Sequence, residues 1–428
     1  MILVALGANL PSSEGAHRET LRRAASRLER RGLRILRRSR IYLTEPVPRS
    51  SQPWYANQVI AVETALDPHA LLALLLDVER EFGRERGVQD AARTLDLDLI
   101  DHDCRLLDTD TLILPHPRMH LRAFVLAPLA EIAPGWRHPL TQADVATLLA
   151  GVDRTGIRAT RDIPLLMGVV NVTPDSFSDG GSYHDVSRAI EHAHWLIEEG
   201  ADILDIGGES TRPGAEPVSI EEEQRRVLPV VRAIAAQAVR RGREVSVDTR
   251  HARTMAASIE AGATMINDVT ALAAAEARRV VAQARVPVIL MHMQGDPRTM
   301  QKNPTYRDVV EDVAAELTQA RDRAVADGID PARIWLDPGI GFGKTLAHNL
   351  ALLDATPTFK ALGHRVLIGA SRKSFIGRVD REGPAADRVG GSVAAAIAAA
   401  QRGADAVRVH DLRETRQALA VWSAIEGE

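Results

Sequence analysis

The chain has 428 residues, of which 45% are hydrophobic, and its formal net charge is −4. This length allows two or three domains, and the charge favours neither nucleic acid nor an anionic membrane as a partner. The single cysteine, Cys104, excludes an internal disulfide and a cysteine-rich zinc site. The opening residues MILVALGANL contain no basic segment and no cleavage-like site, and every apolar run is too short to span a bilayer. We therefore expect a cytoplasmic protein.

The first 134 residues are predicted to form strands and helices that do not alternate strictly, which favours an α+β domain. The expected strands are Ile2–Leu6, Leu33–Leu43, Val59–Leu66 and Thr94–Ile100, and the expected helices are Glu14–Arg31, Pro68–Phe82 and Arg118–Ile132. Between Arg18 and Arg40 lie ten arginines and two acids. A nucleic-acid-binding helix is one interpretation, but a solvated helix face is favoured because no aromatic residues are interleaved.

A change in composition marks the predicted domain boundary. The stretch Ala133–Pro164 contains several turn-forming residues and only a short helical stretch near Ala143–Leu149; the turn formers are Pro134, Gly135, Pro139, Gly151, Gly156 and Pro164. We therefore predict a first domain over 1–134, a linker over 135–163 and a second domain over 164–428.

The second domain is predicted to alternate strands with helices. The expected strands are Leu165–Val170, Ile203–Ile206, Val245–Asp248, Thr264–Asp268, Pro287–His292, Ile334–Asp337, Val366–Gly369 and Ala406–His410. The expected helices include Ser187–Glu199, Ile220–Arg240, His251–Ala261, Ala273–Ala284, Tyr306–Asp327 and Ala386–Arg402. Eight strand–helix units over about 260 residues match an eight-stranded β/α barrel, with a doubly wound open sheet as the alternative.

Polar residues follow the carboxyl ends of these strands, where barrels and parallel sheets place their chemistry. The set mixes carboxylates, amides and cations, and it includes Asn171, Asp205, Asp248, Asn267, Asp337, Lys373, Arg408 and His410. An aspartate can accept two parallel hydrogen bonds from the N–H pair of a guanine-like or pterin-like edge. Arg212, Arg408 and His410 are candidates for holding a phosphate or pyrophosphate, and Asn171 for offering an oxygen to a hard cation.

The segment Asp337–Thr345, DPGIGFGKT, superficially resembles a phosphate-binding P-loop. Its spacing excludes that interpretation, because the position where the motif needs its first glycine is Pro338. We expect instead that its glycines let the backbone approach a flat ligand, with Phe342 as an apolar wall.

Several of these motifs together resemble dihydropteroate synthase. They are NVTPDSFSDGG (171–181), GGESTRPG (207–214), DPGIGFGK (337–344), SRKSF (371–375) and RVHD (408–411), and the match runs from about Leu165 to the C-terminus. The resemblance implies a barrel, homodimeric through that domain, that joins p-aminobenzoate to 6-hydroxymethyl-7,8-dihydropterin pyrophosphate and releases pyrophosphate. The chemistry of that family is largely dissociative, so cations that stabilise the departing pyrophosphate matter more than a base.

The same resemblance implies a role for each matching residue. Pterin would be held by Asp248, Asn267, Asp337, Phe342, Gly369 and Lys373, and p-aminobenzoate would be bordered by Thr211, Arg212, Pro213, Phe342 and Ser374. Pyrophosphate would be bound by Asn171, Arg212, Arg408 and His410, with one Mg²⁺ on Asn171. Lys373, Arg408 and His410 would be catalytic.

The first domain carries its own signal, RTLDLDL (93–99). In a strand, Asp96 and Asp98 share one face, with their carboxylates roughly 7 Å apart along the strand. Like charges so placed repel one another unless a cation lies between them, and paired Mg²⁺ ions on a triphosphate would fit. The alternative from this stretch alone is an edge strand with a solvated acidic face.

Together with Gly7-Ala8-Asn9-Leu10, Tyr55 and Asn57, and Pro115-His116, this signal resembles hydroxymethyl-dihydropterin pyrophosphokinase over about 1–134. The resemblance implies an α+β, ferredoxin-like domain that transfers pyrophosphate from ATP to 6-hydroxymethyl-7,8-dihydropterin. It places two Mg²⁺ on Asp96 and Asp98, pterin on Thr44, Tyr55, Asn57 and Phe124, and ATP on Glu79, Arg84, Arg93, His116 and Arg122. Asp96, Asp98, Arg93 and His116 would be catalytic. One departure stands out: where the family has a Trp-Gly-Pro-Arg run, preceded by another arginine, this chain has Gln89-Asp90-Ala91-Ala92-Arg93.

The sequence thus predicts a bifunctional folate-biosynthesis enzyme in which the product of the first domain is the substrate of the second. Two alternatives are weighed against it. The barrel could belong to pterin-binding methyltransferases, although Lys373 and the Thr211-Arg212-Pro213 stretch favour the synthase. The first domain could be a non-catalytic scaffold or pterin-binding module, because the altered lid loop lacks a tryptophan and an arginine of the family.

Overall fold

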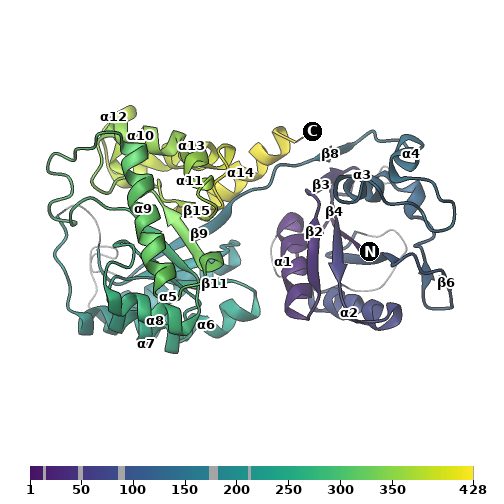
Figure 1. The fold of residues 1–428 in the computed structure, drawn as a ribbon, viewed down its shortest axis with the longest axis horizontal. Coiled ribbons are helices and arrows are strands. Elements are labelled where there is room, and N and C mark those ends of the chain that lie inside the picture. Colours follow the sequence, from purple (N-terminus) through teal and green to yellow (C-terminus); the bar gives the residue numbers. More distant parts are fainter. Residues whose placement is uncertain (13–15, 47–51, 85–91, 173–181, 211–213, 428) are drawn as a thin grey trace. The chain divides into compact units, whose positions relative to one another are not determined.

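The computed structural model describes residues 1–12, 16–46, 52–84, 92–172, 182–210 and 214–427 (Figure 1). The chain divides into two compact units. The first comprises Met1–Asp162 with Val421–Glu428, and the second comprises Ile163–Ala420. Residues 135–163 contain a helix and a strand of the first unit, α4 (Val145–Ala150) and β8 (Ile157–Ala159).

The first unit is built on an antiparallel sheet with the order β5-β1-β4-β3-β8, and β2 also pairs with β4. Its strands are β1 (Ile2–Ala8), β2 (Arg34–Arg38), β3 (Tyr42–Thr44), β4 (Tyr55–Glu63), β5 (Asp96–His102) and β8. Its main helices are α1 (His17–Arg30), α2 (Pro68–Glu81) and α3 (Ala123–Ile132), and a small hairpin pairs β6 (Leu107–Asp108) with β7 (Ile113–Leu114). The order β1-α1-β2-β3-β4-α2-β5 matches the predicted α+β, ferredoxin-like arrangement, with β2 and β3 in the place of one strand.

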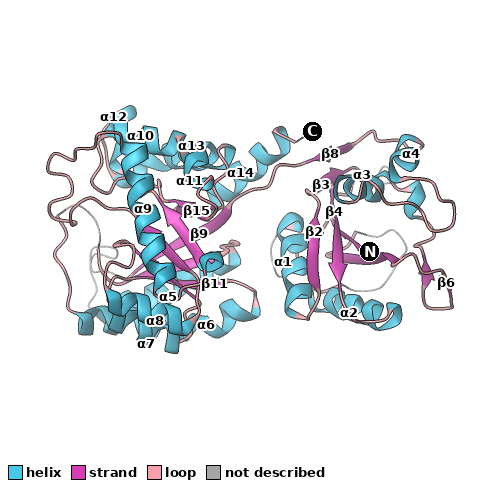
Figure 2. Cartoon of the chain, in the orientation of Figure 1, coloured by secondary structure: helices cyan, strands magenta, loops and turns pink. Residues whose placement is uncertain are grey.

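Helices cover both faces of this sheet (Figure 2). Successive residues of β1 point to opposite faces, so Val4 packs in the cluster that contains Leu21 of α1 and Leu71 of α2. Leu3 packs in the other cluster, with Leu126 of α3. A strand buried on both sides explains why Ile2–Leu6 is apolar throughout.

Two sequence predictions differ from the structure here. The single strand predicted over Leu33–Leu43 is wrong, because β2 and β3 are separate strands on either side of Ser39. Ser39 donates its backbone N–H to the Val59 carbonyl and its hydroxyl accepts from the Val59 N–H. The helix predicted from Arg118 begins instead at Ala123, after a 3₁₀ turn at Met119–Leu121. The arginine-rich stretch forms ion pairs within the unit, for example from Arg27 and Arg31 to Glu81.

The second unit is a closed barrel of eight parallel strands, as predicted. The strands are β9 (Leu165–Asn171), β10 (Ile203–Gly207), β11 (Glu244–Asp248), β12 (Met265–Asp268), β13 (Val288–Met291), β14 (Ile334–Asp337), β15 (Arg365–Ile368) and β16 (Ala406–Val409). β9 pairs with both β10 and β16 and so closes the barrel. Its interior is filled by Met167, Ile203, Met265, Ile289, Trp335, Leu367 and Ala406, so the barrel is a packed core and not a pore.

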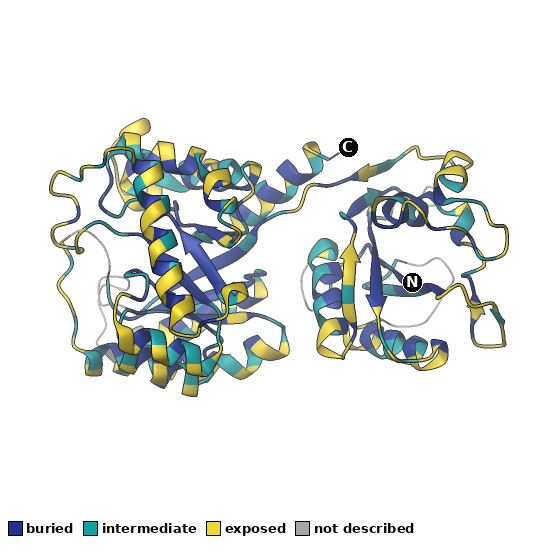
Figure 3. Ribbon diagram, viewed as in Figure 1, coloured by how far each residue is buried: buried dark blue, intermediate teal, exposed yellow. Residues whose placement is uncertain are grey.

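Helices surround the barrel, buried on their inner faces and exposed on their outer faces (Figure 3). They are α5 (Ser182–Glu198), α6 (Ile220–Arg240), α7 (Ala252–Glu260), α8 (Ala275–Ala284), α9 (Val309–Ala326), α10 (Leu346–Asp354), α11 (Thr356–Lys360), α12 (Ser374–Val379), α13 (Val389–Gln401) and α14 (Leu412–Ile425). Short 3₁₀ turns lie at Pro331–Arg333 and Ala385–Arg388. Within the described residues, the chain has no helix with both the length and the apolar character needed to cross a bilayer.

Candidate active sites

The carboxyl ends of the barrel strands bring together the polar residues that the sequence placed there. Arg408, in β16, donates from Nε to Asp205 Oδ2 at 2.7 Å and from Nη2 to Asp248 Oδ2 at 3.1 Å. Asn267 Nδ2 also donates to Asp205 Oδ2, at 3.1 Å. Residues from four strands are therefore connected through one arginine and one buried carboxylate.

These contacts leave polar atoms unused. Asp205 Oδ1 and Asn267 Oδ1 are buried and find no hydrogen-bond partner among the described residues. Burial and the neighbouring Asp205 charge raise the pKa of the Asp248 carboxyl. Buried polar atoms are costly when unpaired, so a ligand that offers N–H donors would be favoured at this point.

The mouth of the barrel is the opening at the carboxyl ends of its strands. β14, β15 and the loops after them form the second half of this opening. Asp337 is buried, and its Oδ1 accepts the Gly339 N–H at 2.8 Å. Lys373 donates from Nζ to the Ile340 carbonyl, and Nζ lies 4.3 Å from the centre of the Phe342 ring. Burial lowers the pKa of Lys373 to about 7, although Asp337 opposes the shift. Gly369 lies beside both groups: a Cβ there would be 3.8 Å from Asp337 Oδ2 and 3.9 Å from Lys373 Nζ.

The remaining predicted residues of the synthase site lie around this cluster or outside the described residues. Asn171 ends β9, and its Oδ1 is 3.9 Å from the position that a Cβ would take on Gly207. His410 follows β16 and contacts Ser371 Oγ through Nδ1 at 3.1 Å. Ser374 is exposed at the first turn of α12. Thr211, Arg212 and Pro213 lie outside the described residues.

Two glycines of DPGIGFGK are required by packing within the protein. Gly339 has φ +70°, and a Cβ there would lie 1.9 Å from the His292 carbonyl oxygen. At Gly343, with φ +63°, a Cβ would lie 2.7 Å from the Gln294 carbonyl oxygen. The loop therefore needs glycine to pack against the loop after β13, and approach to a flat ligand stays a prediction.

Two residues near the mouth received no role from the sequence. Asp205 was noted only as a strand-end residue, and its place in the strand ILDIG gave no sign of its two partners. Lys344 is almost completely buried; its Nζ lies 3.0 Å from His292 Nδ1 and donates to the Phe342 carbonyl at 2.9 Å. Burial lowers the pKa of Lys344 to about 7 and that of His292 to about 3. The position of Lys344 in the DPGIGFGK motif was the feature of the sequence that could have marked this lysine as part of the site.

In the first unit, Asp96 and Asp98 of β5 line two cavities. A cavity of about 630 Å³ is lined by Asp96, Asp98 and all four predicted pterin residues, Thr44, Tyr55, Asn57 and Phe124. A second cavity of about 320 Å³ is lined by Asp96, Asp98 and three of the predicted ATP residues, Glu79, Arg84 and His116. Arg93 and Arg122, the other two, line the larger cavity.

Charge around the two aspartates is unevenly balanced. Asp96 Oδ1 accepts a hydrogen bond from Arg84, and Asp96 Oδ2 accepts one from Arg93 at 2.6 Å. Asp98 has Arg122 at 3.6 Å, which is too far for a hydrogen bond. Burial and the Asp96 charge raise the pKa of Asp98.

Neighbouring side chains hold the site in place. Glu79 accepts the Leu97 N–H at 2.7 Å and pairs with Arg84, and burial raises its pKa to about 7. Asn9 accepts the Arg93 N–H at 2.7 Å, which explains why the GANL stretch belongs to the motif set. Burial lowers the pKa of His116 to about 4, so its imidazole is neutral near neutral pH.

The pterin residues are also prearranged. Asn57 Nδ2 donates to Thr44 Oγ1 at 2.7 Å, and the Arg122 guanidinium lies 5.5 Å from the centre of the Phe124 ring. Most of the predicted lid, residues 85–91, lies outside the described residues.

The fold and these two sites define a class: a pterin enzyme with a pyrophosphokinase-type domain and a barrel domain. Comparison with known families agrees. The model of the 7,8-dihydro-6-hydroxymethylpterin-pyrophosphokinase family matches residues 3–134, and the model described as "Pterin binding enzyme" matches residues 167–410.

Curated relatives and solved structures extend this result. The folate synthesis bifunctional protein, mitochondrial, of Arabidopsis thaliana is 36% identical over 99% of this chain and 83% of its own length. Dihydropteroate synthase of Neisseria meningitidis is 52% identical over 62% of this chain and 93% of its own. The structure of Xanthomonas albilineans dihydropteroate synthase with 4-aminobenzoic acid is 50% identical, with a TM-score of 0.58, over 62% of this chain and 94% of the other.

The chain belongs to the bifunctional folate synthesis family, with a hydroxymethylpterin pyrophosphokinase domain followed by a dihydropteroate synthase domain. It is therefore an enzyme with both activities, and its substrates are a pterin, ATP and p-aminobenzoate. Both families generally use Mg²⁺. The methyltransferase alternative for the barrel is not supported.

Proposed function

We propose that Asp96 and Asp98 form the catalytic centre of the pyrophosphokinase, with ATP in the smaller cavity and the hydroxymethylpterin in the larger. The observation that carries this assignment is that both carboxylates line both cavities. A phosphoryl donor and an acceptor hydroxyl bound on the two sides would meet beside these residues. Positioning of this kind supplies most of the catalysis in phosphoryl-type transfers.

The donor set at this centre fits magnesium. Two carboxylates on one strand face are hard oxygen ligands, and the long separation of 3.6 Å between Asp98 and Arg122 leaves Asp98 short of positive charge. We assign two Mg²⁺ to Asp96 and Asp98; when bound, the ions would neutralise phosphate charge. Arg84 and Arg93 hold Asp96 in place and add positive charge for the phosphates, and neutral His116 can donate a hydrogen bond to a phosphate oxygen.

In the barrel, we assign the pterin ring to Asp337, Asn267 and Asp248. The buried, unpaired Asn267 Oδ1 and the neighbouring carboxylates suit the N–H edge of a pterin, and Phe342 offers it an apolar face. Lys373, beside Gly369, would contact both the ring and the pyrophosphate.

Arg408 and His410 carry the charge that the leaving pyrophosphate needs, since positive and N–H groups stabilise the negative charge that develops on it. Asn171 fits a single oxygen ligand for one Mg²⁺, because Gly207 leaves space beside its Oδ1. Thr211, Arg212, Pro213 and Ser374 are proposed to border p-aminobenzoate, which then attacks the pterin methylene from that side.

We further propose that the protein is a homodimer through the barrel domain. A cytoplasmic location also stays a prediction, as do the domain limits 1–134 and 164–428.

One experiment tests the two-site assignment. Wild type, Asp96→Ala and Asp337→Asn are given hydroxymethyl-dihydropterin, ATP, Mg²⁺ and p-aminobenzoate, and AMP and dihydropteroate are both measured. Asp96→Ala should lose AMP formation yet make dihydropteroate from supplied pterin pyrophosphate, and Asp337→Asn should do the reverse. Asp77→Ala, on the exposed face of α2, is the matched control.

A folded Asp96→Ala protein that loses both activities would contradict separate sites. A wild-type protein that makes dihydropteroate but no AMP would instead make the first domain a pterin-binding module.

A further inference from the structure

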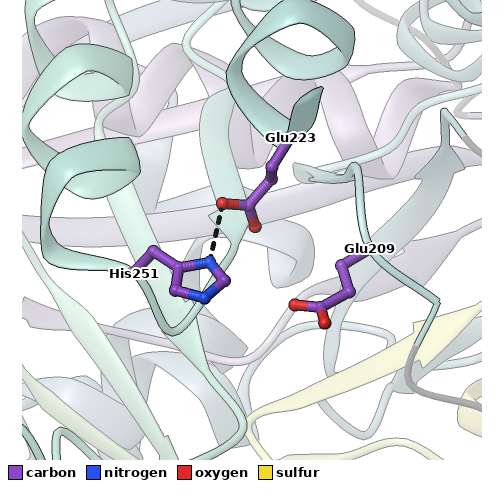
Figure 4. Close-up of side chains that lie close together, drawn as sticks. All are labelled: Glu209, Glu223 and His251. Carbon is purple, nitrogen blue, oxygen red and sulfur yellow. Dashed lines mark hydrogen bonds and ion pairs between the residues drawn. The ribbon is translucent and has the colours of Figure 1, made fainter. Parts of the chain in front are cut away.

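A histidine and two glutamates lie together on the barrel unit outside the set of residues assigned above. Glu209 follows β10, Glu223 lies in the first turn of α6, and His251 comes directly before α7. One potential ligand atom from each lies within 4.8 Å of the other two (Figure 4). Three segments that are far apart in the sequence therefore converge on one point.

Glu223 has an incomplete set of contacts. Its side chain is fully buried, and Oε2 accepts from Thr254 Oγ1 at 2.6 Å and pairs with His251 Nδ1 at 3.0 Å. Oε1 is also buried and has no hydrogen-bond partner among the described residues. Figure 4 shows this second oxygen directed toward the space between the imidazole and Glu209. Because an unpaired buried carboxylate oxygen is costly, this space favours a positive ligand.

The histidine is oriented for such a ligand. With the ring proton on Nε2, the lone pair of Nδ1 faces Glu223, whose Oε2 lies 3.0 Å away. An ion bound by Nδ1 and Glu223 would replace the hydrogen bond between them, whereas an ion on Nε2 would lie on the far side of the ring from Glu223. Glu209 supplies the third group; it pairs with Arg250 at 3.0 Å, and Arg250 is 37% exposed and can turn into solvent.

We propose that Glu209, Glu223 and His251 bind a divalent transition-metal ion, with Zn²⁺ the best match. One imidazole nitrogen and two carboxylate oxygens suit Zn²⁺ better than Mg²⁺ or Ca²⁺, which prefer oxygen alone. Bonds of about 2.0–2.2 Å to each ligand require the three groups to close by roughly 1 Å from their present separation. The ion would connect the end of β10 with α6 and α7. Glu209 lies two residues before Thr211, where the segment proposed to border p-aminobenzoate begins.

Zn²⁺ binding to the whole protein tests this proposal. Equilibrium dialysis with elemental analysis, in excess Mg²⁺ to occupy the magnesium sites, should find one Zn²⁺ per chain. His251→Ala and Glu209→Gln should each weaken binding by about 100-fold, because each removes one of three ligands. Glu221→Gln, an exposed carboxylate two positions away on α6, should bind as wild type.

Two further readouts separate a metal site from a structural contact. Co²⁺ bound in place of Zn²⁺ should give a visible absorption band that His251→Ala removes. Zn²⁺ should raise the thermal midpoint of wild type but not of His251→Ala. If wild type binds no Zn²⁺, or if His251→Ala and wild type bind it equally, the cluster is a hydrogen-bonding contact and the proposal is overturned.

Discussion

Arg408 and Asp205 meet across the mouth of the barrel, with Nε donating to Oδ2 at 2.7 Å. Asp205 is fully buried, and Asn267 donates to the same oxygen. This carboxylate therefore fixes the direction in which the Arg408 guanidinium points. We therefore predict that Asp205 contributes to the synthase reaction as a positioning residue, through Arg408.

The variant Asp205→Asn should slow the synthase step by about 10–100-fold, the value of one or two charge-assisted hydrogen bonds of about 1.5–3 kcal/mol. Single-turnover kinetics should show the loss in the chemical step, with little change in the p-aminobenzoate concentration needed. In an Arg408→Ala background the same substitution should add little, because the group it positions is gone. An equal loss in both backgrounds would contradict the positioning role.

Asp337→Asn should weaken binding of the pterin substrate by about 100-fold. The carboxamide would place an N–H group against an N–H group of the ring in a buried pocket, and such a mismatch costs a few kcal/mol. Calorimetry with the pterin pyrophosphate measures the change. Asp330→Asn, an exposed aspartate just before the same strand, is the control, and unchanged affinity in Asp337→Asn would refute the role.

Binding of pterin pyrophosphate should strengthen as the pH falls toward about 7. The pKa of Lys373 is about 7 in the free protein because of burial, and the anionic ligand favours the ammonium, so its pKa rises in the complex. A pKa that is higher in the complex means that binding takes up a proton, so affinity increases as pH decreases toward the lower value.

Calorimetry in buffers with different heats of ionisation would measure the proton taken up at each pH. Lys373→Arg carries a permanent charge and should lose most of the pH dependence while Asp248 is left in place. If the arginine variant keeps the whole dependence, Asp248 and not Lys373 is the titrating group.

Gly339→Ala should destabilise the barrel unit by about 3 kcal/mol or more, because its Cβ would meet the His292 carbonyl at 1.9 Å and its φ is +70°. Gly363→Ala is the matched control: its φ is +83° but no atom lies within 4 Å of the added Cβ. Gly363→Ala should lower the free energy of unfolding only by the cost of placing alanine in the left-handed conformation, about 1–2 kcal/mol. Calorimetric unfolding compares the two, and equal losses would mean that close packing at Gly339 is unimportant.

Local patterns in the sequence determined the elements and the two families. The apolar runs of Leu165–Val170 and the seven later strands predicted a barrel because strands covered on both faces must be apolar throughout. Asp96 and Asp98 were predicted to share a face because side chains alternate along a strand. Both results depend on residues close together in the chain, and such relationships can be read directly from it.

Contacts between distant residues were decided only by the tertiary structure. The ion pair of Asp205 with Arg408, 203 positions away, and the Lys344 contact with His292 arise from strand order and loop packing. The glycines of DPGIGFGK were recognised as necessary, but the carbonyl that Gly339 approaches belongs to another strand's loop. The cluster of Glu209, Glu223 and His251 likewise exists only because three barrel segments meet. The spacing of residues along the chain determines which face of a strand or helix a side chain occupies. Closure of the barrel determines which residues from other strands and loops that side chain contacts.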